Sequence, residues 1–337
     1  ETSYLDRLGL TVVDHPENTE VIADETGAIH TVSEPRTITA VDSNGYDVTS
    51  LLAVRDGNVW GSDVRSRDFS DESQFRDWIE LTLPDIPQTD YYGTSMNYGT
   101  AKLVITGPYS TLSMLEVWGW YTYILGSPNH AALMQRAETD EQLMSCFDYT
   151  LWNLTSVNVE VWDGSEWQYY TTVELSDGSS HIALLNLKDI PGNRIRLSIP
   201  AGAFSLDYVA VDYSSDKPVT VTELQPAEAY QFSYSPSGSL TTADVLQNIS
   251  AEDGSYAILH LDEWLNYKFE ALDYAPADGM TRSFLIPCTG YYIPEGPEVA
   301  EDKSENLALS EQLACDPVAY AQWVYPLYAY WLNNGSA

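Results

Sequence analysis

Basic residues are scarce in this chain. Among its 337 residues, 15 Lys and Arg stand against 50 Asp and Glu, and the formal net charge is −35 at pH 7. Nucleic acids and anionic membrane surfaces both attract Lys and Arg, so the composition argues against either as a partner. It favours a salty or extracellular setting, in which dissolved cations, Ca²⁺ above all, offset the charge.

Long apolar runs and C-x-x-C motifs are also missing. No stretch approaches the roughly 18 apolar residues that a transmembrane helix needs, so we expect no membrane insertion. The three cysteines, Cys146, Cys288 and Cys315, form no C-x-x-C motif, which disfavours a zinc ribbon, a thioredoxin-like redox motif and c-type haem. Cys288 and Cys315 are a candidate disulfide in an exported protein, and two buried free thiols are the alternative.

The common catalytic motifs are absent. The sequence contains no H-E-x-x-H, G-x-S-x-G, G-x-G-x-x-G or P-loop motif. Asp207 and Asp212 resemble the carboxylate pair of a glycosidase, but their odd spacing in one predicted strand places them on opposite faces. We therefore expect a protein that is not an enzyme and that carries no nucleotide, haem or zinc.

Aromatic residues and short alternating segments are abundant. Phe, Trp and Tyr make up 12% of the chain, whereas a disordered acidic chain would lack them. In Val157–Trp162, Arg194–Ile199 and Trp78–Leu83, every second residue is apolar. This period is typical of antiparallel strands with one wet face, and many such strands favour a sandwich or barrel.

One segment breaks this rhythm. Ser127-Pro128-Asn129 precedes a run rich in Ala, Leu, Met, Gln and Glu, which predicts a helix from about 128 to 146. The predicted fold is therefore all-β: a jelly-roll-like β-sandwich with one capping helix, plus a second, smaller β-sandwich domain. The predicted boundaries are an N-terminal segment at 1–35, the jelly roll at 36–213, a linker at 214–240 and a C-terminal β domain at 241–337.

Part of the sandwich resembles a known scaffold. The segment Val157–Tyr213 includes VEVWDGSEWQYY, RIRLSIP and FSLDYVAVDYS. These match an apolar–x–V–x–dG–x–W strand, an R-I-R-L strand and a final iD-v-v-l strand. With these three strands, the segment resembles the closing half of galactose-binding-like jelly rolls. The match covers under a quarter of the chain and implies a scaffold without specifying an activity.

A second resemblance extends over most of the chain. YLDRLGLTVVDH, YDVTSLLAVRDG, the sandwich and SYAILHLDEWLNYKFEALDYAPADGMTRSFLIPCTGYY follow one another. This order is similar to the region that follows FG-GAP-type β-propellers in large secreted or surface proteins of bacteria and archaea. Residues 278–285 and 290–292 match that family's P-x-G-x-x-R-D-F-L-x-x-x-x-G-w/y pattern, but its usual GWDKDGD continuation is absent. The resemblance implies export and assembly.

Two groups of residues are candidate binding sites. Asp42, Asn44 and Asp47 surround Gly45 with oxygen atoms, which suits either a Ca²⁺ site or an ordinary hairpin turn. Trp162, Trp167 and Tyr169 could stack against sugar rings or contact a protein partner, and packing in the core is the alternative.

Three N-x-S/T triplets are candidate glycosylation sites. They stand at Asn153, Asn248 and Asn334, and they matter only in a secreted chain.

The sequence thus favours a non-catalytic, exported β-sandwich protein that is a structural or adhesive part of a cell-surface or extracellular assembly. Its expected partners are other protein subunits or glycans. A carbohydrate-binding module, with or without Ca²⁺, is the first alternative, and a glycan-active enzyme is the weaker one.

Overall fold

The computed structural model describes residues 2–24, 26–61, 76–85, 101–107, 109–110, 156–174, 182–200, 204–235 and 238–293, with single residues at 145, 316, 319 and 322. This part of the chain is almost entirely β, as predicted, and has no helix of seven or more residues. None of its helices is long and apolar enough to cross a membrane. The predicted helix near 128–146 lies almost wholly outside the described residues.

The chain divides into two compact units. Unit 1 combines Glu1–Val21 with Asp216–Pro297, and unit 2 combines Ile22–Ser215 with Glu298–Ala337. Each unit is described separately below.

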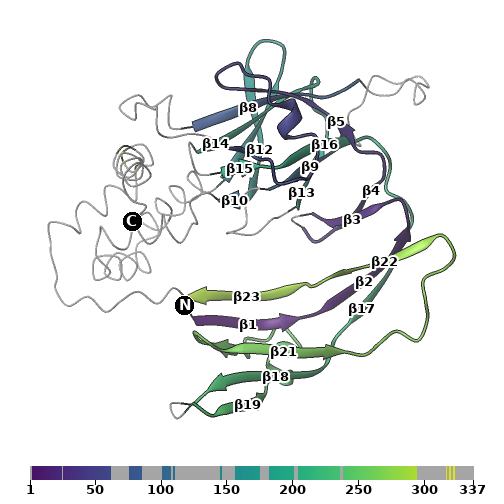
Figure 1. The fold of residues 1–337 in the computed structure, drawn as a ribbon, viewed down its shortest axis with the longest axis vertical. Helices are drawn as coiled ribbons and strands as arrows, with labels where there is room; N and C mark the ends of the chain where they lie inside the picture. The colour runs from purple at the N-terminus through teal and green to yellow at the C-terminus, as the bar shows by residue number, and fades with distance from the viewer. Residues whose placement is uncertain are drawn as a thin grey trace. The chain divides into compact units, whose positions relative to one another are not determined.

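Unit 2 contains two main antiparallel sheets (Figure 1). The first has the strand order β12-β11-β14-β8-β6 and the second the order β13-β9-β16-β5. The strands of the first sheet are β6 (Thr39–Asp42), β8 (Arg76–Thr82), β11 (Ser156–Trp162), β12 (Trp167–Glu174) and β14 (Arg194–Pro200). Those of the second are β5 (Arg36–Thr37), β9 (Ala101–Thr106), β13 (Ile182–Leu187) and β16 (Tyr208–Asp212).

Shorter elements complete the described part of unit 2. The strands β7, β10 and β15 form one small sheet and β3 pairs with β4. Their bounds, with that of the 3₁₀ helix η1, are β3 (Glu20–Ala23), β4 (Ile29–Val32), η1 (Thr49–Leu51), β7 (Trp60–Gly61), β10 (Tyr109–Ser110) and β15 (Phe204–Leu206).

The two main sheets of unit 2 pack face to face around one apolar core. Alternate residues of each strand point inward, as the predicted period of two requires. The core includes Val157, Val159 and Val161 from β11, together with residues of β8, β14, β9 and β16. Ile195 and Leu197 of β14 are fully buried. Unit 2 is therefore a β-sandwich, and the strands predicted at Val157–Trp162, Arg194–Ile199 and Trp78–Leu83 are confirmed within about two residues at each end.

Unit 1 is built around a long antiparallel ribbon. The strands β1 (Thr2–Leu8) and β2 (Leu10–Pro16) run beside β23 (Cys288–Ile293) and β22 (Met280–Leu285), as Figure 1 shows. On the other side of the ribbon, β20 (Ala257–Leu259) pairs with β1 and β17 (Thr220–Leu224) pairs with β2.

The backbones of the ribbon come very close at one glycine. Gly290 lies opposite Leu5, next to an irregularity in β1 at Asp6. A Cβ atom at Gly290 would lie 2.2 Å from the carbonyl oxygen of Tyr4. Only glycine fits this position, because real Cβ atoms essentially never approach so closely.

A second sheet of unit 1 has the order β19-β18-β21, from β18 (Pro226–Tyr234), β19 (Leu240–Asp244) and β21 (Trp264–Phe269). It contributes Ala229, Leu265 and Phe269 to a small core that also contains Leu8 of the ribbon. The 3₁₀ helix η4 (Leu246–Ile249) adds Ile249 to this core.

The unit boundaries differ from those expected from the sequence. The stretch 214–240, expected to be a linker, contains β17 and β18. The first strands of the chain pair with strands that lie more than 200 residues later. Sequence composition alone carries no signal for such distant pairing, because composition describes local segments and not which segments meet.

Candidate functional site

The predicted aromatic group lies on the first sheet of unit 2, on the face opposite the core. Trp162 and Trp167 are direct cross-strand partners at the end of the β11–β12 hairpin, with ring centroids 5.3 Å apart. The hairpin turn is closed by Asp163, whose Oδ1 accepts hydrogen bonds from the backbone N–H groups of Glu166 and Ser165. These bonds lower the pKa of Asp163 to about 2.

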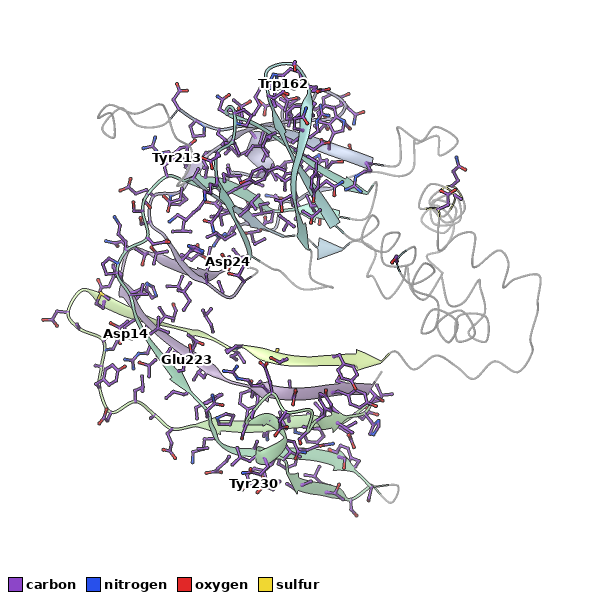
Figure 2. The ribbon with its side chains drawn as sticks, turned by 180° about the vertical axis from the view of Figure 1, so that it is seen from behind. Asp14, Asp24, Trp162, Tyr213, Glu223 and Tyr230 are labelled. Carbon is purple, nitrogen blue, oxygen red and sulfur yellow. The ribbon has the colours of Figure 1, made fainter. Side chains whose placement is uncertain are left out.

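Two arginines of β14 lie against the tryptophans of this face. Arg194 lies over both Trp162 and Trp167, with its guanidinium carbon 4.8 and 5.2 Å from the ring centroids. Arg196 lies between Trp167 and Trp78, at 4.2 and 4.3 Å. We call these five residues the tryptophan–arginine ladder; Figure 2 labels Trp162.

Carboxylates on the neighbouring strands hold the two arginines in place. Glu80 of β8 accepts hydrogen bonds from Nε and Nη2 of Arg194 at 2.8 and 2.5 Å. Oε2 of Glu160 on β11 lies 3.9 Å from Nη1 of Arg196. Burial lowers the pKa of the Arg196 guanidinium, although Glu160 and Glu80 oppose this shift.

The ladder is better suited to support than to ligand binding. A sugar ring stacks on an exposed aromatic face, but guanidinium groups already lie over the rings of Trp78, Trp162 and Trp167. The third predicted residue, Tyr169, is 59% exposed and is not among the ladder contacts. The structure therefore brings Trp162 and Trp167 together as cross-strand partners, with the Arg194 guanidinium against both rings.

The predicted Ca²⁺ residues form a hairpin turn in the structure. Oδ1 of Asp42 accepts hydrogen bonds from the backbone N–H groups of Asn44 and Tyr46, both at 2.9 Å. Gly45 has a φ of 82°, which glycine adopts easily. Asp47 accepts a hydrogen bond from the Thr49 N–H, and its hydrogen bonds to Thr49 lower the pKa of its carboxyl. Within the described ranges, no group of three or more His, Cys, Asp or Glu is placed to hold a metal ion.

The remaining predicted sites are only partly described. Cys288 is exposed on β23, and its candidate partner Cys315 lies outside the described residues. Asn248 belongs to η4, where its side chain donates a hydrogen bond to the carbonyl oxygen of Tyr256. Asn153 and Asn334 also lie outside the described residues.

A second aromatic surface lies in unit 1, on the sheet of β19, β18 and β21. Tyr230, Phe232 and Tyr234 alternate along β18, on the face opposite the core residue Ala229. Trp264 of β21 is the cross-strand partner of Phe232, and Leu240 of β19 is the partner of Tyr234. We call these five residues the aromatic face; Tyr230 is labelled in Figure 2.

The aromatic face is open to solvent. Tyr234 is 61% exposed, Leu240 52%, Tyr230 38% and Trp264 37%. The rings of Phe232 and Trp264 are stacked, with centroids 5.5 Å apart and planes within 8° of parallel. The ring of Tyr234 is tilted relative to that of Trp264, with centroids 5.8 Å apart. These contacts lie among the rings themselves, and Tyr230, Tyr234 and Trp264 each keep more than a third of their surface exposed to solvent.

Polar residues border the aromatic face in register. Tyr230 lies between Asp244 of β19 and Asn266 of β21, and Phe232 has Thr242 as its partner on β19. One step further along the strands, Lys268 donates a hydrogen bond to Glu228 at 2.9 Å. Glu228 raises the pKa of Lys268. The face is thus an apolar strip with hydroxyl, amide and carboxylate groups beside it.

Sequence reasoning missed this surface because it assigned all of β18 to a linker. A signal was present in the alternation of Tyr230, Phe232 and Tyr234 with Gln231 and Ser233. Ordinarily the apolar set of such a strand faces the core. Here Gln231 occupies the core-facing set, where it donates hydrogen bonds to the carbonyl oxygen of Ile258 and to Glu263.

Comparisons with protein-family models, with curated proteins and with solved structures found no match to this chain. The function is therefore inferred from the chemistry of the tryptophan–arginine ladder and the aromatic face.

Proposed function

We propose that the protein is a non-catalytic adhesive component of an extracellular or cell-surface assembly and that it attaches through the aromatic face of unit 1. The observation that carries this proposal is the exposure of Tyr230, Tyr234 and Trp264 together on one sheet face. Contiguous apolar patches on a soluble protein commonly mark interaction sites, and Tyr and Trp are enriched where binding energy concentrates.

The contrast with unit 2 supports this assignment. In the tryptophan–arginine ladder the rings are covered by guanidinium groups, whereas Trp264 and Tyr234 have no arginine among their described ring contacts. Unit 2, with its continuous core between two sheets, then acts as a rigid support.

The charge and the resemblances support export. A net charge of −35 suits a setting with abundant cations. Similarity to the regions that follow FG-GAP-type propellers and to galactose-binding-like jelly rolls favours a place in a secreted or surface assembly, and it also favours a scaffold without catalytic groups.

Hydroxyl-radical footprinting tests the proposal without knowledge of the ligand. Tyr230, Tyr234 and Trp264 should be oxidised in the purified protein and protected in the native assembly. Tyr46, which is 70% exposed on the hairpin turn of unit 2, provides the matched control and should react equally in both. Equal oxidation of the aromatic face in both samples would contradict the proposed attachment.

A second candidate is assembly with other protein subunits through strand addition at β19. All five residues of β19 are exposed, and among the described strands β19 lies at the edge of its sheet. It contains neither lysine nor proline, which often protect such edges. Thr242→Pro should then abolish assembly in sedimentation velocity, while Trp264→Ala should leave it unchanged.

A further inference from the structure

The size of the aromatic face restricts what it can bind. The five residues occupy three neighbouring strands and the positions from 230 to 234 along β18. With standard strand spacing and rise, this corresponds to about 10 Å by about 14 Å. A stable protein interface buries roughly 800 Å² on each partner, so the face by itself is far too small for one. It matches the dimensions of a few linked ring-sized units.

The arrangement of groups on the face also selects a ligand chemistry. Tyr230, Phe232 and Tyr234 recur at every second residue, so the apolar strip is linear and follows the strand. Thr242, Asp244 and Asn266 lie beside the strip in register. A ligand that suits it is a chain of repeating rings with an apolar C–H surface and hydroxyl groups at the edges.

The charge of the protein decides between classes of such chains. With 35 excess negative charges, the protein repels polyuronates, sulfated chains and nucleic acids. On the face itself Asp244 adds a carboxylate, while Glu228 and Lys268 neutralise each other. A chain of uncharged rings is not repelled by the negative charge of the protein, and a chain whose rings carry protonated amino groups is attracted by it.

From these three observations we propose that the aromatic face binds a glycan chain without acidic groups, either neutral or amine-bearing, by stacking its sugar rings on Trp264, Tyr234 and Tyr230. This inference rests on the proposed adhesive function and names the ligand class of the same face. Neighbouring hydroxyl, amide and carboxylate groups would hydrogen-bond the sugar hydroxyls at the edges of the rings.

The test is affinity electrophoresis of the full chain in gels that contain a neutral β-glucan, chitosan or alginate. The glucan and chitosan should retard the protein, and the anionic alginate should not. Salt should weaken retardation by chitosan and leave that by the glucan unchanged, because only the first includes charge attraction. Retardation by alginate equal to that by the glucan would overturn the inference.

Substitutions on the aromatic face test whether glycans bind there. Trp264→Ala and Tyr234→Ala should each reduce glucan affinity about tenfold or more, as removal of a central aromatic contact does. Trp264→Phe keeps an aromatic ring and should lose less glucan affinity than Trp264→Ala. Tyr46→Ala, an equally drastic change at an exposed tyrosine of unit 2, should bind like the unaltered chain.

The outcomes separate this inference from the proposed function. If no glycan retards the protein but footprinting shows the face protected in the native assembly, the glycan inference is wrong and the adhesive function stands. If glycans bind and both Trp264→Ala and Tyr234→Ala bind normally, the face is not the glycan site and the glycan inference fails, whereas footprinting still decides the adhesive function. Because Tyr234 is 61% exposed, Tyr234→Ala should fold even if Trp264→Ala does not.

Discussion

The ammonium nitrogen of Lys102 lies 3.8 Å from Oδ2 of Asp212, and the two side chains are only 4% and 0% exposed. Lys102 also donates a hydrogen bond to the carbonyl oxygen of Thr31. Asp212 accepts hydrogen bonds from the N–H groups of Ser33 and Ser214, at 2.8 and 2.7 Å. The pair therefore fastens the segment around residues 31–33 to strands β9 and β16.

Removal of either member of this pair should destabilise unit 2. Lys102→Met or Asp212→Ala leaves a buried charged group without its ion-pair partner, and each should lower the free energy of unfolding by about 3–5 kcal/mol. Urea denaturation followed by tryptophan fluorescence measures this. Lys268→Ala, which breaks an exposed ion pair, is the control and should change stability little. An equally small effect of the buried changes would contradict the role of the pair.

Asp212 should also make unit 2 sensitive to acid. Burial raises the pKa of Asp212, but hydrogen bonds from Ser214 and Ser33 and the charge of Lys102 outweigh this, so the pKa is lowered. A lowered pKa contributes stability above the unfolded value of about 3.9, and this contribution is lost as the pH falls through the folded value. Denaturation midpoints of the unaltered chain should fall below about pH 4, and Asp212→Asn should flatten that dependence. If the denaturation midpoints of Asp212→Asn fall with pH as steeply as those of the unaltered chain, Asp212 is not the source of the acid sensitivity.

Gly290→Ala should disrupt the ribbon of unit 1. The added Cβ atom would lie 2.2 Å from the Tyr4 carbonyl oxygen, so β1 and β23 must separate. We expect a loss of at least about 2 kcal/mol, in the range of overpacking or beyond. Gly192→Ala is the control, because its Cβ atom would make only an ordinary contact at 3.6 Å. Thermal unfolding curves of the two variants give the comparison, and equal midpoints would refute the close approach.

The tryptophan–arginine ladder should stabilise unit 2 without taking part in binding. Arg196→Ala removes the guanidinium between Trp78 and Trp167, with an expected cost of about 1–2 kcal/mol. Tryptophan fluorescence should change as both rings gain solvent contact, while glycan retardation should not. A large loss of binding with unchanged stability would instead make the ladder a binding site.

Salt should raise the melting temperature of the protein. Screening weakens the repulsion among 35 excess negative charges. Ca²⁺ at matched ionic strength tests the candidate site separately. A further gain that Asp42→Ala combined with Asp47→Ala removes would indicate bound Ca²⁺, whereas an equal gain with both salts would leave Asp42 and Asp47 as turn residues. A melting temperature that is constant from low to molar salt would contradict the repulsion.

The all-β class and several strands of unit 2 were determined by local sequence. Val157, Val159 and Val161 alternate with polar neighbours, and this period of two by itself assigns one face to the core. The turn at Gly45 was also readable, because Asx turns and positive φ angles depend on neighbouring residues alone. Sequence grouped Trp162 with Trp167 only as candidate ligand-binding aromatics, and the structure pairs them across one turn.

Only the tertiary structure decided which strands share a unit and which aromatic residues remain uncovered. The pairing of β2 with β17 and β22 joins residues separated by more than 200 positions, and no local pattern specifies it. Arg194 and Arg196 belong to β14, which lies outside the β11–β12 hairpin that carries Trp162, so the sequence did not show that these arginines lie over the predicted aromatic site. Likewise, Trp264 and Tyr234 become one exposed surface only because Gln231 takes the core-facing side of β18. Alternation shows which residues share a face, whereas exposure of that face depends on what the rest of the chain places against it.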